Sequence, residues 1–368
     1  AFVDDTKVGC TSTYVHEDCV SLQENLLRAE ADAIAKLGVL SQQWERLLFA
    51  TGGALCLAKS FWYLLSWRWS KSGKAYPATV ALAPGRLLLT AGTDLSPVEV
   101  PRIEPTSSFR TLGIRISPAG RSDLAISVLR SHSIDFATKV SSSNLTREAT
   151  YWAFWQFYTP KVGFSLPTLH LSQAECKRIQ SPAICATLSK LHFNRCTSRA
   201  IVFGSSKYAG LDLPHLATAE NVGQLRLLLG HLRLQDKTAD LILIDISYIQ
   251  LLVGSSTIFF NLPHDTYKWL VDDCWLTSIW AFLSTIQFQL AIKRAYIPSP
   301  QRDQDVALMD LFVRQKHDHK RLMALNRCRV FLSVLFLSDI CSADGTTILH
   351  AFRKGERSTD RISNLDWP

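Results

Sequence analysis

The chain has 368 residues, of which 47% are hydrophobic, and it carries a formal net charge of +8 at pH 7. This hydrophobic share excludes a chain that is disordered throughout, and the length predicts two or three domains. The positive charge favours a polyanionic partner, with nucleic acid ahead of an anionic membrane surface.

The first fifty residues predict a hairpin followed by one long helix. Residues 1–10 alternate loosely around Asp4-Asp5, which is typical of a tight β-hairpin. Apolar residues then recur at spacings of three, four and seven over residues 21–50, so we expect an amphipathic helix there. Gly52-Gly53 should end this helix, because glycine tolerates the left-handed backbone that closes a helix.

The period changes to two between Leu55 and Trp69. The odd-numbered positions are large and apolar except for Lys59, which predicts a half-buried strand, or two strands in a hairpin, with these side chains inward. Further strands are expected over residues 76–90, 98–103 and 109–116. Residues 1–120 should therefore form a small antiparallel sheet packed by the long helix.

Helical spacing dominates from about Ser122 onward, so the predicted fold class is α+β with a mostly α-helical second part. The segment from Pro298 to Gln304 is the best linker candidate, which divides the chain into residues 1–120, 121–300 and 301–368. No run of 18 clean apolar residues occurs, so we expect no membrane partner. Helices are expected over residues 122–140, 146–157, 171–190, 217–235, 239–252, 266–294 and 304–338.

Nine cysteines are scattered along the chain, and none of them forms a C-x-x-C pair. Zinc sites of the usual spacing are therefore not indicated. Unpaired, scattered cysteines suit a reducing intracellular compartment, where they behave as small buried apolar residues. The sequence does not indicate which compartment that is.

The sharpest chemical motif is Phe2-Val3-Asp4-Asp5. Two aspartates at a hairpin tip suit two-metal phosphoryl transfer, in which carboxylates hold Mg²⁺ or Mn²⁺ across the attacking and leaving oxygens. The same pattern also suits an ordinary surface turn, in which aspartate is common. The motif therefore needs support from its surroundings.

That support comes from the order of the following blocks. The helix leads to Gly52-Gly53-Ala-Leu-Cys-Leu-Ala-Lys59-Ser60, and a later block reads Phe109-Arg-Thr-Leu112-Gly113-Ile114. This order resembles the palm of a reverse transcriptase, especially of non-LTR retrotransposons. There F/Y-x-D-D precedes a helix, a G-x-x-L-N-x-x-K-S/T segment and a Y/T-L-G-I strand. Cys56 stands where the family has asparagine.

The resemblance continues toward the thumb and covers roughly residues 1–216. Tyr158–Pro167 is similar to the family's P-K-L-x-Y-x-L-P block. Phe203-Gly204 and Tyr208–Leu213 resemble its G-x-x-x-G-G-L-G-L block, with Ala209 and Asp212 in place of glycines. The resemblance implies a palm-and-thumb part of an RNA-directed DNA polymerase, with an RNA template, a DNA primer and dNTP as partners.

The resemblance also assigns roles to residues. Asp4 and Asp5 would hold Mg²⁺ or Mn²⁺, and Lys59 would lie near the phosphates of the incoming nucleotide, where a cation stabilises or protonates the leaving pyrophosphate. An alternative for Lys59 is a lysine at a sheet rim that reaches into solvent. A further metal-binding aspartate and the fingers would lie on an upstream half of the same polyprotein, before Ala1.

Two other candidates occur in the second half. Asp272-Asp273 repeats the Asp pair, but its apolar neighbours follow helical spacing, which predicts the polar face or the start of a helix. His317 and His319 lie among cations that predict a basic helix face for a phosphate backbone, or else an ordinary solvated face. These cations are Arg314, Lys316, Lys320, Arg321, Arg327 and Arg329.

Three functions therefore compete. The first is an incomplete reverse transcriptase that is inactive by itself. The second is a non-catalytic nucleic-acid-binding remnant of a decayed retroelement. The third is a metal-dependent nuclease, although no H-x-x-x-D or D-x-x-x-D block accompanies Asp4.

Overall fold

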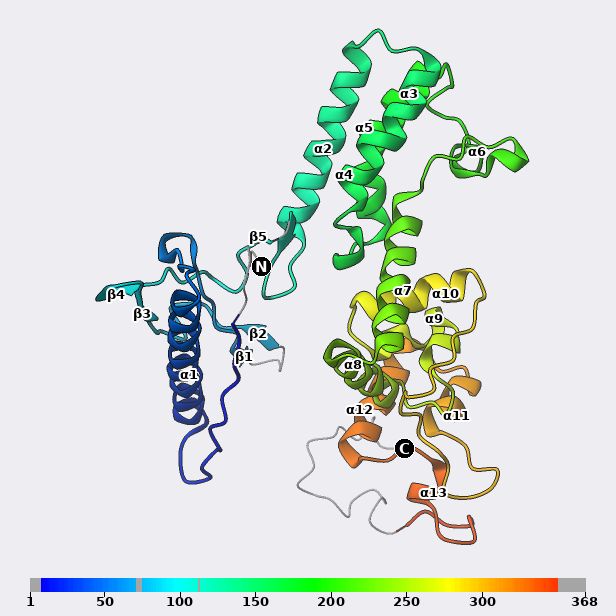
Figure 1. Cartoon of the computed structure of the whole chain (residues 1–368). Helices are drawn as coiled ribbons and strands as arrows, with labels where there is room; N and C mark the ends of the chain where they lie inside the picture. Colours follow the sequence, from blue (N-terminus) through cyan, green and yellow to red (C-terminus); the bar gives the residue numbers. More distant parts are fainter. Residues whose placement is uncertain (1–7, 71–74, 112, 350–368) are drawn as a thin grey trace. The chain divides into compact units, whose positions relative to one another are not determined.

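The computed structural model describes residues 8–70, 75–111 and 113–349 (Figure 1). These residues form two compact units. The first unit takes the described residues up to Thr150 together with Arg178–Lys190, and the second takes Tyr151–Lys177 and the described residues from Leu191 onward. The fold class is α+β, as predicted. The domain boundaries near residues 120 and 300 stay predictions.

Helix α1, Leu22–Ala50, confirms the long helix at both ends. The Ser21 side chain caps its first turn, and Gly52 follows its C-terminus with a φ of +83°. Its fully buried side chains are nevertheless polar: Asn25, Glu30 and Glu45. Leu22, Leu40 and Leu47 of the predicted apolar stripe are exposed, while Leu37 and its neighbour Ile34 pack against a small core in the same unit.

The predicted single sheet is wrong in detail, because the described strands pair into three separate two-stranded antiparallel sheets. Each sheet is a local hairpin, since its two strands follow each other in the chain. α1 packs against β3 (Figure 1). The pairs are β1 (Trp67–Trp69) with β2 (Ala75–Pro77), β3 (Leu88–Ala91) with β4 (Asp94–Glu99), and β5 (Phe109–Thr111) with β6 (Ile114–Ile116).

The strand predicted from Leu55 to Trp69 is also corrected. Only β1 is a strand, and Leu57–Lys59 forms a 3-10 turn, η1. The even-numbered Trp62 is buried instead of its odd-numbered neighbours, and its indole Nε1 donates to the Val100 carbonyl at 3.1 Å. Trp62 forms a small core with Leu87, Leu89 and Val100, against which Ile34, Leu37, Leu55, Leu57 and Leu64 pack.

Residues 109–116 form a hairpin instead of the single strand that the sequence predicts. Phe109 faces Ile116 and Thr111 faces Ile114 in the register of β5 and β6. Gly113 lies at the turn with a φ of +86°, which glycine adopts at little cost. Leu112 lies outside the described residues.

Helices joined by loops make up most of the described chain from Asp123 onward. In this part, no helix has both the length and the hydropathy that a membrane crossing needs. The helices are α2 (Asp123–Ser142), α3 (Arg147–Ala153), the π-helix η2 (Phe154–Tyr158), α4 (Thr159–Gly163), α5 (Gln173–Lys190), α6 (Arg199–Phe203), α7 (Leu216–Leu234), α8 (Lys237–Val253), α9 (His264–Tyr267), α10 (Trp275–Thr285), α11 (Leu308–Arg314), α12 (His319–Leu332) and α13 (Leu337–Ile340). Short 3-10 turns are η3 (Leu166–Thr168), η4 (Ser206–Tyr208), η5 (Phe259–Asn261) and η6 (Lys268–Leu270).

The two longest helices predicted after residue 260 are wrong. Residues 266–294 contain α9, η6 and α10 with breaks between them, and residues 304–338 contain α11, α12 and the start of α13. Asp272-Asp273 lies directly before α10, as expected for the start of a helix. Trp280 of α10 is fully buried against Phe259, and its Nε1 donates to the Leu262 carbonyl at 2.8 Å.

Arg329 contradicts the predicted basic helix face, because it is buried and bonded within the second unit. Its guanidinium donates to the carbonyls of Leu251 at 2.5 Å and Leu252 at 3.0 Å, and its Nε donates to Asn326 Oδ1 at 2.9 Å. The cation thus satisfies carbonyls in the last turn of α8, where the helix dipole favours positive charge. Burial lowers the pKa of Arg329 to about 10, so it stays charged at neutral pH.

We expect Arg329→Met to lower the free energy of unfolding by about 2–4 kcal/mol, because it leaves buried carbonyls of α8 without donors. Arg327→Met is the matched control, since Arg327 is exposed on the same helix. Urea unfolding of both variants measures the difference. Equal stability of the two variants would show that Arg329 does not hold α8 to α12.

Candidate functional site

The predicted metal ligands lie outside the described residues. This applies to Phe2, Val3, Asp4 and Asp5, and also to Leu112 of the later block. Their roles therefore stay predictions. The described part of the site consists of the segment that follows the Asp pair and of the blocks around Lys59 and Gly113.

The segment after the Asp pair lies along α1. Ser12 Oγ donates to Asp32 Oδ2 at 2.8 Å, and the Thr13 amide donates to the same oxygen at 2.9 Å. Tyr14 Oη donates to Asn25 Oδ1 at 3.0 Å. The hydrogen bonds from Ser12, followed by that from Lys36, lower the pKa of Asp32. The chain is thus fixed to α1 shortly after the predicted metal site.

Lys59 ends the turn η1 and is exposed, so it does not lie on a buried strand face as the alternation predicts. Ser60 closes the turn: its Oγ donates to the Cys56 carbonyl at 2.9 Å. Leu57 of the same turn packs toward the core around Trp62. The turn thus holds one side chain inward and presents the lysine ammonium to solvent, where an anion can reach it.

The structure brings two of the sequence blocks together. The Phe61 ring follows the Lys59 block directly, and its centroid lies 4.7 Å from that of Phe109, which opens the later block. The Tyr63 ring lies 6.1 Å from the same Phe109 ring. Contacts between these aromatic rings join the segment after Gly52-Gly53 to the β5–β6 hairpin.

The block from Phe203 to Leu213 forms a tight loop in the second unit. The Asp212 amide donates to the Gly204 carbonyl at 2.9 Å, and the Leu213 amide donates to the Val202 carbonyl at 3.1 Å. A Cβ on Gly210 would collide with the Gly204 carbonyl, so only glycine fits there. Ala209 and Asp212 have positive φ values of 60° and 56°.

The predicted basic helix face is a corner between two helices. Arg314 ends α11, Lys316 lies in the connection with a φ of +57°, and Lys320 and Arg321 lie in the first turn of α12. Asp318 caps α12 by accepting from the Arg321 amide at 2.8 Å. Arg314, Lys316 and Lys320 are exposed and Arg321 is half-buried, so a polyanion could contact the corner without following one helix face.

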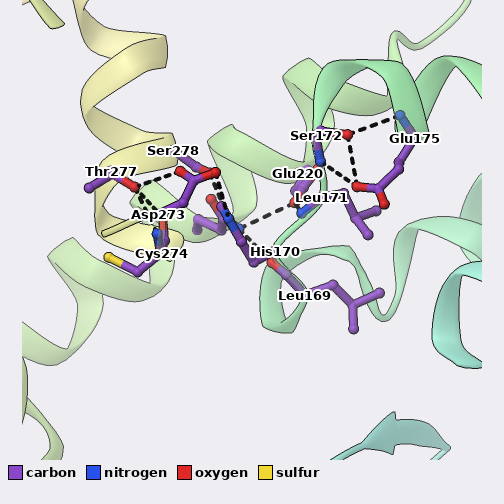
Figure 2. Close-up of polar contacts among 11 residues, drawn as sticks. Leu169, His170, Leu171, Ser172, Glu175, Glu220, Asp273, Cys274, Thr277 and Ser278 are labelled. Atoms are coloured by element: carbon purple, nitrogen blue, oxygen red, sulfur yellow. Dashed lines mark hydrogen bonds and ion pairs between the residues drawn. The ribbon is translucent and has the colours of Figure 1, made fainter. Parts of the chain in front are cut away.

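Sequence reasoning missed a polar cluster in the second unit (Figure 2). His170 Nδ1 lies 2.9 Å from Ser278 Oγ of α10, and its Nε2 lies 3.7 Å from Asp273 Oδ2. A serine, a histidine and an aspartate also form hydrolytic triads, but 3.7 Å is too long for the hydrogen bond that orients the imidazole there. The contacts instead fasten the loop before α5 to the start of α10.

Glu220 of α7 is the buried centre of the adjacent contacts (Figure 2). Its Oε1 accepts from the Leu171 amide at 2.8 Å, and its Oε2 accepts from the Cys176 thiol at 3.1 Å. Burial raises the pKa of Glu220 to about 7, and the hydrogen bonds from Cys176 and Leu171 oppose this shift in part. Burial also raises the pKa of the Cys176 thiol, so the thiol stays protonated and donates.

This cluster carried no local sequence signal, since Glu220 and the groups it binds are far apart in the chain. Within the described residues, no three histidine, cysteine, aspartate or glutamate side chains gather as a group that could hold a metal ion.

The chain matches no protein-family model, no curated protein and no solved structure.

We expect Glu220 to make the folded state less stable as the pH rises. Its folded pKa of about 7 lies above its ordinary value of 4.5, so its contribution is fully present below pH 4.5 and is lost as the pH rises to about 7. The loss is at most about 3 kcal/mol, from 1.36 kcal/mol for each pKa unit. Urea unfolding at several pH values measures it.

Glu220→Gln keeps the size and the acceptor oxygen but cannot ionise, so its unfolding free energy should fall less over this pH range than that of the unmodified chain. Glu148→Gln, at an exposed position of α3, is the control and should leave the pH dependence unchanged. Parallel pH profiles for Glu220→Gln and the unmodified chain would contradict the assignment.

Proposed function

We propose that this chain is the palm-and-thumb part of an RNA-directed DNA polymerase that uses two-metal nucleotidyl transfer. The observation that carries the proposal is the order of its blocks: the Asp pair, α1, Gly52-Gly53, Lys59 and the β5–β6 hairpin. The described blocks of this series lie in one compact unit, and the Phe61–Phe109 contact joins two of them.

The backbone of the later block supports the proposal. The family pattern has glycines at the positions of Ala209 and Asp212, and both residues have the left-handed conformation that glycine adopts without strain. Gly210 is retained where a Cβ would collide with the Gly204 carbonyl. The loop therefore has a left-handed backbone at both positions where the family pattern has glycine, which fits the proposal.

Lys59 is the described residue that the proposal places nearest the chemistry. Its exposed position at the end of η1 leaves the ammonium available to a nucleotide phosphate. A cation there would stabilise or protonate the pyrophosphate that leaves. Asp4 and Asp5 would hold Mg²⁺ or Mn²⁺, which would activate the primer hydroxyl and neutralise the phosphates.

The reaction also requires a further metal-binding aspartate and fingers, which the proposal assigns to a part of the same polyprotein before Ala1. Without them the chain should bind nucleic acid but not extend a primer. A decayed, non-catalytic remnant would bind in the same way. A metal-dependent nuclease would differ, since it would cleave nucleic acid without that upstream part.

We expect the chain joined to a matching upstream half to extend a DNA primer on an RNA template with Mg²⁺ or Mn²⁺. Asp4→Asn should abolish extension, because it removes a charged metal ligand at constant size, and Asp5→Asn should impair it. Lys59→Ala should slow single-turnover extension about 100-fold while changing nucleotide affinity less. Asp272→Asn is the control and should extend at the unmodified rate.

Three outcomes would contradict this proposal. Full extension by Asp4→Asn would remove the proposed metal site. Metal-dependent cleavage by the isolated chain would favour the nuclease. A joined protein that binds the primer–template duplex but never extends the primer would favour the decayed remnant.

We expect binding of the primer–template duplex to weaken steeply with salt, because each neutralised phosphate releases counterions. Replacing Arg314, Lys316, Lys320 and Arg321 together with alanine should reduce the slope of log K against log salt by about 0.9 for each phosphate that is no longer neutralised. Gln315→Ala is an uncharged control in the same corner. An unchanged slope in the fourfold variant would assign these cations to a solvated surface.

A further inference from the structure

The β1–β2 hairpin has two different faces. Side chains alternate across a strand, so Trp67 and Trp69 share one face with their register partners Pro77 and Ala75. Arg68 and its partner Tyr76 share the other face. The tryptophan face is open, because 46% of Trp67 and 57% of Trp69 are exposed, against 4% of the core residue Trp62.

The opposite face is anchored to α1. Arg68 Nη2 lies 2.7 Å from Glu30 Oε1 in an ion pair whose side chains are mostly buried. Ser66 Oγ also donates to Glu30 Oε1, and the Ala78 amide donates to the Ser66 carbonyl at 2.7 Å. Because Arg68 is tied to Glu30, the alternation of the strand turns both indoles away from α1. The tryptophans are thus presented by a fixed strand.

Two aromatic side chains at positions i and i+2 of a strand lie about 7 Å apart. Sheet aromatics at such positions stack successive bases of a single strand, and this stacking tolerates any base. The register partners of the indoles are the small residues Ala75 and Pro77, and the net charge of +8 favours a polyanion. We infer that the Trp67–Trp69 face binds single-stranded RNA by stacking its bases.

The choice of RNA rests on the proposed function, in which the RNA template is the strand that stays unpaired ahead of the primer. RNA binding can nevertheless be measured without primer extension. An experiment can therefore contradict the proposed RNA-binding face without contradicting the proposed polymerase function, and the reverse. Residues 71–74 add two lysines by sequence but lie outside the described residues, and the proposed surface does not include them. A protein segment packed on the same face is the competing occupant.

The test uses the full chain and a labelled uridine oligomer of about 12 nucleotides, whose binding is followed by fluorescence anisotropy. Trp67→Ala and Trp69→Ala should each weaken binding roughly 5- to 150-fold, the range for one stacked base. The slope against salt should stay unchanged, because neither indole neutralises a phosphate. Trp152→Ala is the matched control, since Trp152 is 52% exposed on α3 and lies outside this surface.

Trp69→Phe should restore most of the affinity that Trp69→Ala loses, because phenylalanine keeps a stacking ring. Duplex RNA should compete poorly, since its bases are not free to stack. Unmodified affinity in the Trp67→Ala/Trp69→Ala double variant would overturn the inference, and so would equal competition by duplex RNA. Loss of RNA binding on joining the upstream half would assign the face to protein packing instead.

Discussion

The first unit depends on the carboxylates that α1 buries. Isolated two-stranded hairpins are marginal in water, so each of them needs an attachment. Glu45 supplies one: its Oε1 accepts from the Gly92 amide at 2.7 Å, between β3 and β4. Glu30 supplies another through Arg68 of β1. The long helix thus replaces the neighbouring strands that would otherwise hold these hairpins together.

Buried carboxylates stabilise a fold only when their oxygens are satisfied. Glu45 meets this condition, since Gln42 Nε2 also donates to its Oε2 at 3.1 Å. The buried polar groups near Trp62 satisfy this condition only in part. Glu30 Oε2 has no hydrogen-bond partner among the described residues, and neither do the guanidinium nitrogens of Arg102, which lies 4.7 Å from the centre of the Trp62 ring. Burial lowers the pKa of Arg102, while Glu104 and Glu30 oppose the shift.

Local signals made the ends of α1 predictable, because a cap and a glycine act on the backbone beside them. The face of the segment from Leu55 to Trp69 could not be predicted in this way. The predicted alternation is correct for β1. Which face of β1 turns inward is decided by the ion pair of Arg68 with Glu30, which lies on α1. Glu220 was missed for the same reason: its partners Leu171 and Cys176 are distant in sequence, and nothing near Glu220 marks it as buried.

The dependence on contacts with residues distant in sequence also explains why the segment from Leu55 to Trp69 can present both a cation and two indoles. Trp62 fixes its middle through the bond to Val100, and Arg68 fixes its end through Glu30. Leu57 and Leu64 of the segment also pack against the core around Trp62. Lys59 and the indoles of Trp67 and Trp69 are exposed on a backbone that these contacts hold in place. A surface held in this way loses little entropy when it binds a ligand, which is the condition under which a few exposed side chains can bind with useful affinity.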